Sequence, residues 1–259
     1  MSKLKEKLER ASMSSPPPMG FRAAQKICRP RMVIIAQFPK GWSEDPSAYI
    51  TGADAGLVEW SAARALKKAI KADADISWGV QIENAKAGSL EEMASAGADF
   101  VLFKAEDVPL SLAADEKMGK VLVTGQLPGD GWVRSLGKLP IDALFISGQA
   151  AEEKNGFTWQ QLMTFRYYSD MVAKPILVPV PAGVKEAELQ AMWDAGVDGV
   201  VVKVEAGLPQ DRLSDIRAMI DGLTPPSKRR EKGATAIVPA MRDEAKPVVE
   251  EDEEEEEDE

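Results

Sequence analysis

The stretch Ala195-Gly196-Val197-Asp198-Gly199-Val200-Val201-Val202 joins the end of a helical pattern to a run of β-branched residues. A glycine just after a helix takes the left-handed conformation that ends it, and the aspartate two residues later opens a strand. The same junction occurs earlier as Ala94-Ser95-Ala96-Gly97-Ala98-Asp99-Phe100-Val101. This repeated helix-to-strand junction predicts a chain of alternating helices and strands.

Short apolar runs alternate with helical patterns eight times between residues 30 and 223. The runs lack strict polar alternation, which is typical of strands covered on both faces in a parallel sheet. The predicted strands are residues 32–37, 55–59, 76–82, 99–104, 120–124, 141–147, 175–180 and 198–204. The predicted helices include residues 61–74, 90–96, 159–173, 185–195 and 210–223, and residues 46–50 offer only a short helix between the first two strands.

Capping signals support two of these helices. Ser89 with Glu92, and Thr158 with Gln161, have the spacing of the capping box, in which each side chain bonds the backbone amide near the other. Gly97 and Gly196 supply the matching stop signals at helix ends.

Eight strand-helix units predict one small (β/α)8 (TIM) barrel over residues 30–223. The alternative is an open doubly wound sheet, which carries a glycine-rich phosphate turn after its first strand. Here that strand runs into Ala36-Gln37-Phe38-Pro39-Lys40-Gly41, which has no such turn. The sequence therefore favours the barrel.

Two segments flank the predicted barrel. Residues 1–29 form an N-terminal extension in which Leu4 and Leu8 share one face of a short basic helix, expected to cap one end of the fold. Residues 224–259 are rich in charge and poor in apolar side chains, so we expect a disordered tail that ends in an acidic run. The acidic run is expected to keep the chain solvated or to bind a basic protein partner.

Composition excludes several kinds of chemistry. The 259-residue chain has no histidine, which removes Ser-His-Asp and Cys-His catalysis and any His-ligated metal site, and Cys28 is its only cysteine. The net charge of −10 equals the contribution of the ten acidic residues at 250–259, so the rest is formally neutral and can accept an anionic ligand. We expect a cytoplasmic protein without a membrane span. We do not expect nucleic acid as a partner, because aromatic and basic residues are not interleaved.

The ends of the predicted strands carry the candidate site residues, because reactive groups in such barrels lie at the C-terminal ends of the strands. The polar residues at or just after these ends include Gln37, Glu59, Glu83, Lys104, Ser147 and Lys203. Side chains alternate along a strand, so Lys104 belongs with Phe100 and Leu102, and Lys203 with Val201. We expect both lysines and the two glutamates to surround the barrel mouth.

This set of side chains fits two kinds of catalysis. A lysine there can form a Schiff base with a carbonyl while a carboxylate moves the proton that histidine often moves. Alternatively, the lysines bind an anion and a glutamate abstracts a proton. Lysine–glutamate pairs can also line a mouth simply because charges there need partners.

The residues Pro181-Ala182-Gly183-Val184, together with the junction at 195–202, resemble the region of strands seven and eight in phosphate-binding (β/α)8 barrels of the indole-glycerol-phosphate synthase and tryptophan synthase α type. The resemblance implies that backbone amides near Gly183 and Gly207 bind a phosphate beside a helix N-terminus. This chain departs from the pattern, because it has Ala182 in place of the first glycine and Lys203 where a glycine follows strand eight. Lys203 then supplies charge, and Ser147 and Gln37 complete the expected anion site.

The resulting hypothesis is an enzyme of the aldolase, lyase or isomerase kind that acts on a small anionic carbonyl metabolite, with or without a phosphate group. Lys104, Glu83 and Glu59 are the catalytic candidates, and no metal or cofactor is expected. One alternative is a non-catalytic barrel that binds or assembles through its charged termini. A further alternative is a barrel that binds flavin mononucleotide (FMN) at the same anion site.

Overall fold

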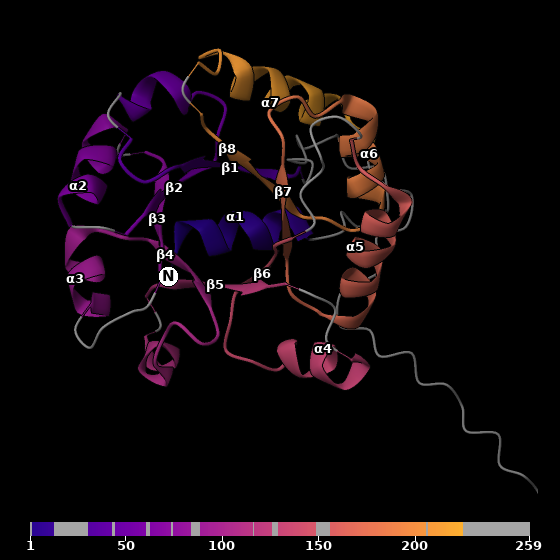
Figure 1. Cartoon of the computed structure of the whole chain (residues 1–259), viewed down its shortest axis with the longest axis horizontal. Coiled ribbons are helices and arrows are strands. Elements are labelled where there is room, and N and C mark those ends of the chain that lie inside the picture. Colours follow the sequence, from indigo (N-terminus) through magenta and orange to yellow (C-terminus); the bar gives the residue numbers. More distant parts are fainter. Residues whose placement is uncertain are drawn as a thin grey trace, which may run out of the picture.

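Eight parallel strands close into a barrel in chain order, and β1 pairs with both β2 and β8 (Figure 1). The computed structural model describes residues 2–12, 31–42, 45–60, 63–73, 75–83, 89–115, 117–125, 129–148, 156–205 and 207–224. The strands are β1 (Val33–Phe38), β2 (Ala55–Glu59), β3 (Ser77–Gln81), β4 (Phe100–Lys104), β5 (Gly119–Thr124), β6 (Ala143–Ile146), β7 (Ile176–Val180) and β8 (Gly199–Lys203). The predicted barrel is confirmed, and each predicted strand overlaps an observed one.

Helices surround the barrel and follow most of the strands (Figure 1). They are α2 (Ala63–Ala72), α3 (Ser89–Ala96), α4 (Asp130–Leu136), α5 (Trp159–Met171), α6 (Glu186–Asp194) and α7 (Arg212–Gly222), with the 3-10 helices η1 (Pro46–Tyr49) and η2 (Leu110–Ala114). The capping box at Thr158 and Gln161 is present, whereas α3 begins at Ser89 itself. Gly97 and Gly196 have φ angles of 96° and 93°, as their role at helix ends requires.

Helix α4 is one element that the sequence pattern did not predict. It begins at Asp130 inside a glycine-rich stretch that reads as a tight turn, because Gly129 and Gly131 disfavour a helix. Val133 and Leu136 are buried, so packing against the barrel outweighs the local preference. The expectations for residues 13–30 and for the acidic tail lie outside the described residues.

Two apolar cores lie on the two faces of the closed sheet. The outward-facing strand residues pack against the helices. The inward-facing residues form a second core inside the barrel, which contains Phe100 and Leu102 of β4 and Val201 of β8. The alternation expected along these two strands is therefore confirmed.

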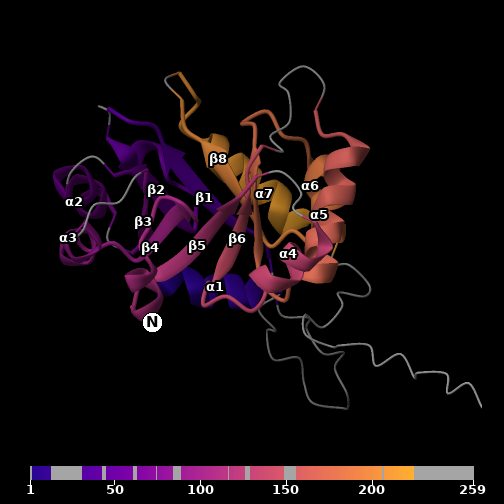
Figure 2. The same cartoon turned by 60° about the horizontal axis from the view of Figure 1, so that its bottom comes forward.

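A helix at the N-terminus closes one end of the barrel. Helix α1 (Lys3–Ser12) lies across the end at which the strands begin, as Figure 2 shows. Leu4, Leu8 and Ala11 share one face of this helix and are buried in the inner core. The capping role expected for Leu4 and Leu8 is confirmed by these contacts.

An aspartate immediately precedes each even-numbered strand, and three of the four make the same pair of bonds. The backbone N–H of Asp54 donates to Ile34 O at 2.8 Å, and its carboxylate accepts from Ile34 N at 2.9 Å. Asp142 makes the same exchange with Lys120 of β5, and Asp198 with Ile176 of β7. Each carboxylate thus extends the parallel ladder by one hydrogen bond and sets the register of two strands.

The fourth aspartate, Asp99 before β4, binds helix α1 instead. Its carboxylate accepts from Ser2 Oγ at 2.8 Å, Lys3 N at 2.8 Å and Leu4 N at 3.0 Å, and also from the Ser77 hydroxyl. Burial opposes ionisation of Asp99, but the four hydrogen bonds outweigh it and hold its pKa below the usual 3.8. Asp99 therefore fixes the N-terminal end of α1 to the sheet.

Replacement of Asp99 by alanine should destabilise the protein by about 3 kcal/mol, because a buried carboxylate is lost and its donors remain unpaired. Urea unfolding followed by circular dichroism measures this change. Asp170→Ala is the matched control, since Asp170 forms an exposed ion pair with Arg166 whose loss should cost about 0.5 kcal/mol or less. Equal effects of the two substitutions would contradict the role given to Asp99.

Acid should weaken the attachment of α1. A carboxylate with a lowered pKa in the folded state contributes stability above its unfolded pKa, and that contribution is lost as pH falls through the folded value. For Asp99 the loss therefore begins near its ordinary value of 3.8 and continues below it. The stability difference between the wild type and Asp99→Asn should narrow from pH 6 to about pH 2.5, and a constant difference would contradict this assignment.

Candidate functional site

The C-terminal ends of the strands form the mouth of the barrel, opposite the end that α1 closes (Figure 2). Because Phe100, Leu102 and Val201 face the inner core, the last residues of β4 and β8 continue the inward-facing sets. These last residues are Lys104 and Lys203, and both are exposed. The structure thus brings the two predicted lysines to one end of the fold.

A hydrogen bond between two amides lies among these inward-facing sets. Gln37 of β1 donates from Nε2 to Gln81 Oε1 of β3 at 2.7 Å, and both side chains are partly buried. Gln37 was predicted as a site residue, but Gln81 was missed. The alternation Ser77, Gly79, Gln81 along β3 is the signal that places it inward with Gln37.

Two of the mouth cations have carboxylate partners. Lys203 pairs with Glu205 at 2.9 Å, and Lys40 pairs with Glu59, the last residue of β2, at 3.3 Å. Within the described ranges, no carboxylate forms an ion pair with Lys104. Ion pairing at the mouth therefore accounts for Glu59 and Lys203, but not for Lys104.

The other two polar candidates differ in how firmly they are held. Ser147 follows β6 and donates from Oγ to the carbonyl of Thr124 at 3.1 Å. On the helix-facing side of the sheet, the buried hydroxyls of Thr124 and Tyr168 lie 3.2 Å apart, and burial raises the pKa of Tyr168 despite this hydrogen bond. Glu83 lies two residues beyond β3 and is exposed.

The loops after β7 and β8 contain the two glycines that the resemblance singled out. Gly207 has a φ of 90°, a conformation that side chains other than glycine rarely adopt, whereas Gly183 is exposed with open space where a Cβ would lie. At the start of α6, Glu188 accepts hydrogen bonds from Lys185 N and Phe157 N. This carboxylate occupies the helix end where a phosphate was expected.

Arg212 links these two loops and was missed by the sequence analysis. It is the first residue of α7, and its guanidinium donates to the carbonyls of Ala182 and of Val184. Both carbonyls lie on the turn that contains Gly183. An arginine nine residues beyond the last strand gave no signal in sequence, because its partners are backbone oxygens of a different loop.

The described part of the chain contains no cluster of three acidic or cysteine side chains that could hold a metal ion. It also contains no helix that is long and apolar enough to cross a membrane.

The closed parallel barrel and the polar side chains at its mouth define the class of the protein, a (β/α)8 barrel of the kind in which many enzymes place their reactive groups. Solved structures in the same class resemble it. Thiamine phosphate pyrophosphorylase from Pyrococcus furiosus has a TM-score of 0.55 at 14% identity, over 73% of this chain and 96% of that one.

Tryptophan synthase structures resemble it as well. An aminoacrylate-bound form from M. tuberculosis has a TM-score of 0.55 at 14% identity, over 73% of this chain and 94% of that one. A mutant α-subunit from Pyrococcus furiosus has a TM-score of 0.52 at 12% identity, over 74% and 98%. At these identities the likeness shows the fold. Comparison of the sequence with models of protein families gives no match, and comparison with curated proteins gives none either.

The two loop glycines should respond differently to replacement by alanine. Gly207→Ala should destabilise the protein by about 1–2 kcal/mol, because an L-residue is strained at that positive φ. Gly183→Ala should change stability by less than about 0.5 kcal/mol, since its backbone is unstrained and the added methyl group meets open space. Thermal unfolding of both variants measures the two changes in stability. A Gly183→Ala variant as strongly destabilised as Gly207→Ala would contradict this prediction.

Proposed function

We propose that the chain is an enzyme of the lyase or isomerase kind, including aldolases, whose site is the mouth of the barrel. The observation that carries this proposal is Lys104, which ends the inward-facing set of β4 and has no ion-pair partner within the described segments, whereas Lys40 and Lys203 are paired. An ammonium that is not committed to a carboxylate of the fold remains available to a substrate. Its substrate would be a small anionic carbonyl compound.

Lys104 is the proposed nucleophile or electrostatic anchor. As a nucleophile its neutral amine adds to the substrate carbonyl carbon, the carbonyl oxygen leaves as water, and an iminium remains. The iminium withdraws electrons from the neighbouring carbon, so that a bond to hydrogen or carbon there can break. Glu59 at the end of β2 and Glu83 beyond β3 are the proposed proton carriers. In the barrel β3 lies beside β4, and β2 lies on the far side of β3.

The anionic part of the substrate would lie nearer to β8 and β1. Lys203 supplies the positive charge there, and its ion pair with the substrate would replace its ion pair with Glu205. Gln37 supplies an amide for a hydrogen bond. Gly183, Gly207 and Ser147 line the neighbouring loops and complete the proposed anion site. A phosphate is one anion of suitable chemistry, and a carboxylate is another.

Borohydride reduction tests the proposed Schiff base. Wild-type protein incubated with a panel of keto acids and sugar phosphates should gain the mass of one substrate as a secondary amine, and peptide mapping should place it on Lys104. Lys104→Ala should abolish this adduct, because the iminium can no longer form. Lys67→Ala is the matched control, since Lys67 is exposed on α2 outside the mouth and its loss should leave the adduct unchanged.

An adduct that maps to another lysine, or that persists in Lys104→Ala, would overturn the nucleophilic role. If no compound of the panel forms an adduct and Lys104→Ala leaves every detected turnover unchanged, the catalytic proposal fails. A non-catalytic barrel that acts through its charged termini would then be the better reading.

A further inference from the structure

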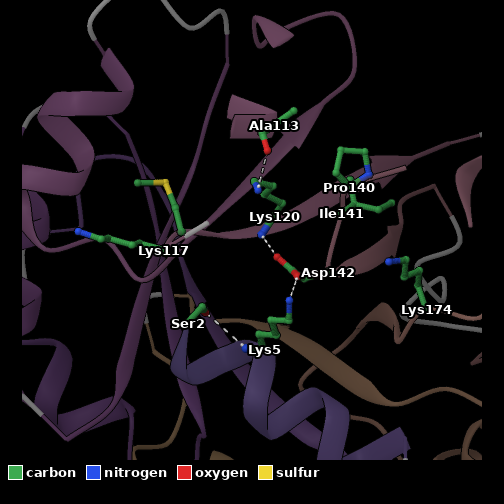
Figure 3. Close-up of a pocket in the computed structure, with 10 residues that line it drawn as sticks. Ser2, Lys5, Ala113, Lys117, Lys120, Pro140, Ile141, Asp142 and Lys174 are labelled. Carbon is green, nitrogen blue, oxygen red and sulfur yellow. Dashed lines mark hydrogen bonds and ion pairs between the residues drawn. The ribbon is translucent and has the colours of Figure 1, made fainter. Parts of the chain in front are cut away.

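A cavity lies at the opposite end of the barrel from the mouth. It has a volume of about 600 Å³ and is bounded by the N-terminal part of α1, by η2 and by the segments that lead into β5, β6 and β7 (Figure 3). This volume lies within the range of small-molecule sites, about 300–1,000 Å³. The cavity shares no residue with the proposed active site.

The charges around this cavity are mostly positive. Its charged lining residues are Lys5, Lys117, Lys120, Lys174 and Asp142, an excess of three positive charges among the described residues. In Figure 3 the ammonium groups of Lys5 and Lys174 point towards Asp142, whereas Lys117 points away. The cavity therefore concentrates cations around one carboxylate.

That carboxylate is already shared. Asp142 Oδ1 pairs with Lys5 Nζ at 2.8 Å, and Asp142 Oδ2 accepts the backbone N–H of Lys120 at 2.9 Å. The hydrogen bond to Asp142 raises the pKa of Lys5, so that Lys5 stays charged. Asp142 thus bonds both β5 and α1, and its single negative charge is smaller than the combined positive charge of the four lysines that line the cavity.

Lys120 is the most informative of these lysines. It belongs to β5 and is buried, with only 8% of its surface exposed. Its ammonium donates to the carbonyl of Ala113 at 3.3 Å, and none of the described carboxylates forms an ion pair with it. A buried ammonium with two further donors is costly unless it gains a counter-charge.

The geometry points to an anion-binding site in this cavity, which takes a small molecule with two or more negative charges on oxygen, such as a phosphate ester or a dicarboxylate. Lys120 and Lys174 bind the anion from β5 and from the segment before β7, and Lys5 binds it from α1. Because α1 contributes to the site and also closes the barrel, bound anion stabilises the closed end. The site is separate from the mouth, so its ligand acts as an effector or structural ligand and not as the substrate.

Inorganic pyrophosphate is the probe for this site, and amide resonances of the full chain report where it binds. Saturable shifts are expected at Ala113 and Ile141, which line the cavity. Lys120→Gln and Lys174→Gln should each weaken the binding that these resonances report by about tenfold, the effect of losing one charged hydrogen bond. Lys67→Gln, on α2, is the matched control with the same loss of charge and should bind as the wild type does.

Asp142→Asn should have the opposite effect and tighten pyrophosphate binding, because it removes the negative charge of the only carboxylate among the described lining residues. The asparagine amide oxygen can still accept the hydrogen bond from Lys120 N. Absence of shifts at Ala113 and Ile141, or equal affinity of wild type and Lys120→Gln, would overturn the proposal. If Lys120→Gln does not fold, the pyrophosphate affinities of Lys174→Gln and Asp142→Asn test the proposal without it.

A final arm distinguishes a free anion from the chain's own acidic residues. The ten residues at 250–259 are all acidic, and replacing them with glutamine or asparagine in the full chain removes ten carboxylates that would compete with pyrophosphate if they bound this site. Tighter pyrophosphate binding by this variant at low salt would support a site for carboxylates that the same chain can fill. Unchanged affinity would support a site for free anions.

Discussion

The paired hydrogen bonds of the aspartates at the start of the even-numbered strands are the constraint on which the rest of the structure depends. A parallel sheet has slanted hydrogen bonds of even spacing, and its register is not set by a hairpin turn. In this barrel the carboxylates of Asp54, Asp142 and Asp198 each accept a backbone amide from the preceding strand. If one strand shifted by one residue against its neighbour, this hydrogen bond would break and the carboxylate would lose its backbone partner. These aspartates therefore favour one register.

The same aspartates position helix α1. Asp99 binds the first amides of the helix, Asp142 binds Lys5, and the carbonyl of Asp54 accepts a hydrogen bond from Lys7 at 2.6 Å. Polar bonds thus hold α1 at three points while Leu4 and Leu8 fill the barrel beneath it. Polar bonds and apolar packing therefore fasten α1 to the end of the barrel at which the strands begin. The proposed reaction site and the contacts that hold α1 lie at opposite ends of the barrel.

How far the sequence predicts this structure depends on the distance over which each signal acts. Alternation along β4 and β8 placed Lys104 and Lys203 correctly, because the period of a strand is a local property. Arg212 and the cavity around Lys120 were not predicted, since their partners come from loops that meet only when the barrel closes. Helix α4 was missed for a related reason, because burial of Val133 overrides the glycines at its start. The site residues themselves remain predictions, because position at the mouth does not establish a reaction.

The placement of α1 has a consequence for how the chain folds during synthesis. Ser2 and its partner Asp99 are 97 residues apart in sequence, and Lys5 and Asp142 are farther apart still. At a synthesis rate of about 5–20 residues per second, roughly 7 to 27 seconds pass between the emergence of α1 and that of Asp142. During that time the apolar face of Leu4 and Leu8 has no barrel to enter. Helix α1 is therefore made before its partners and docks only after they follow, and its exposed leucines are available to chaperones on the growing chain.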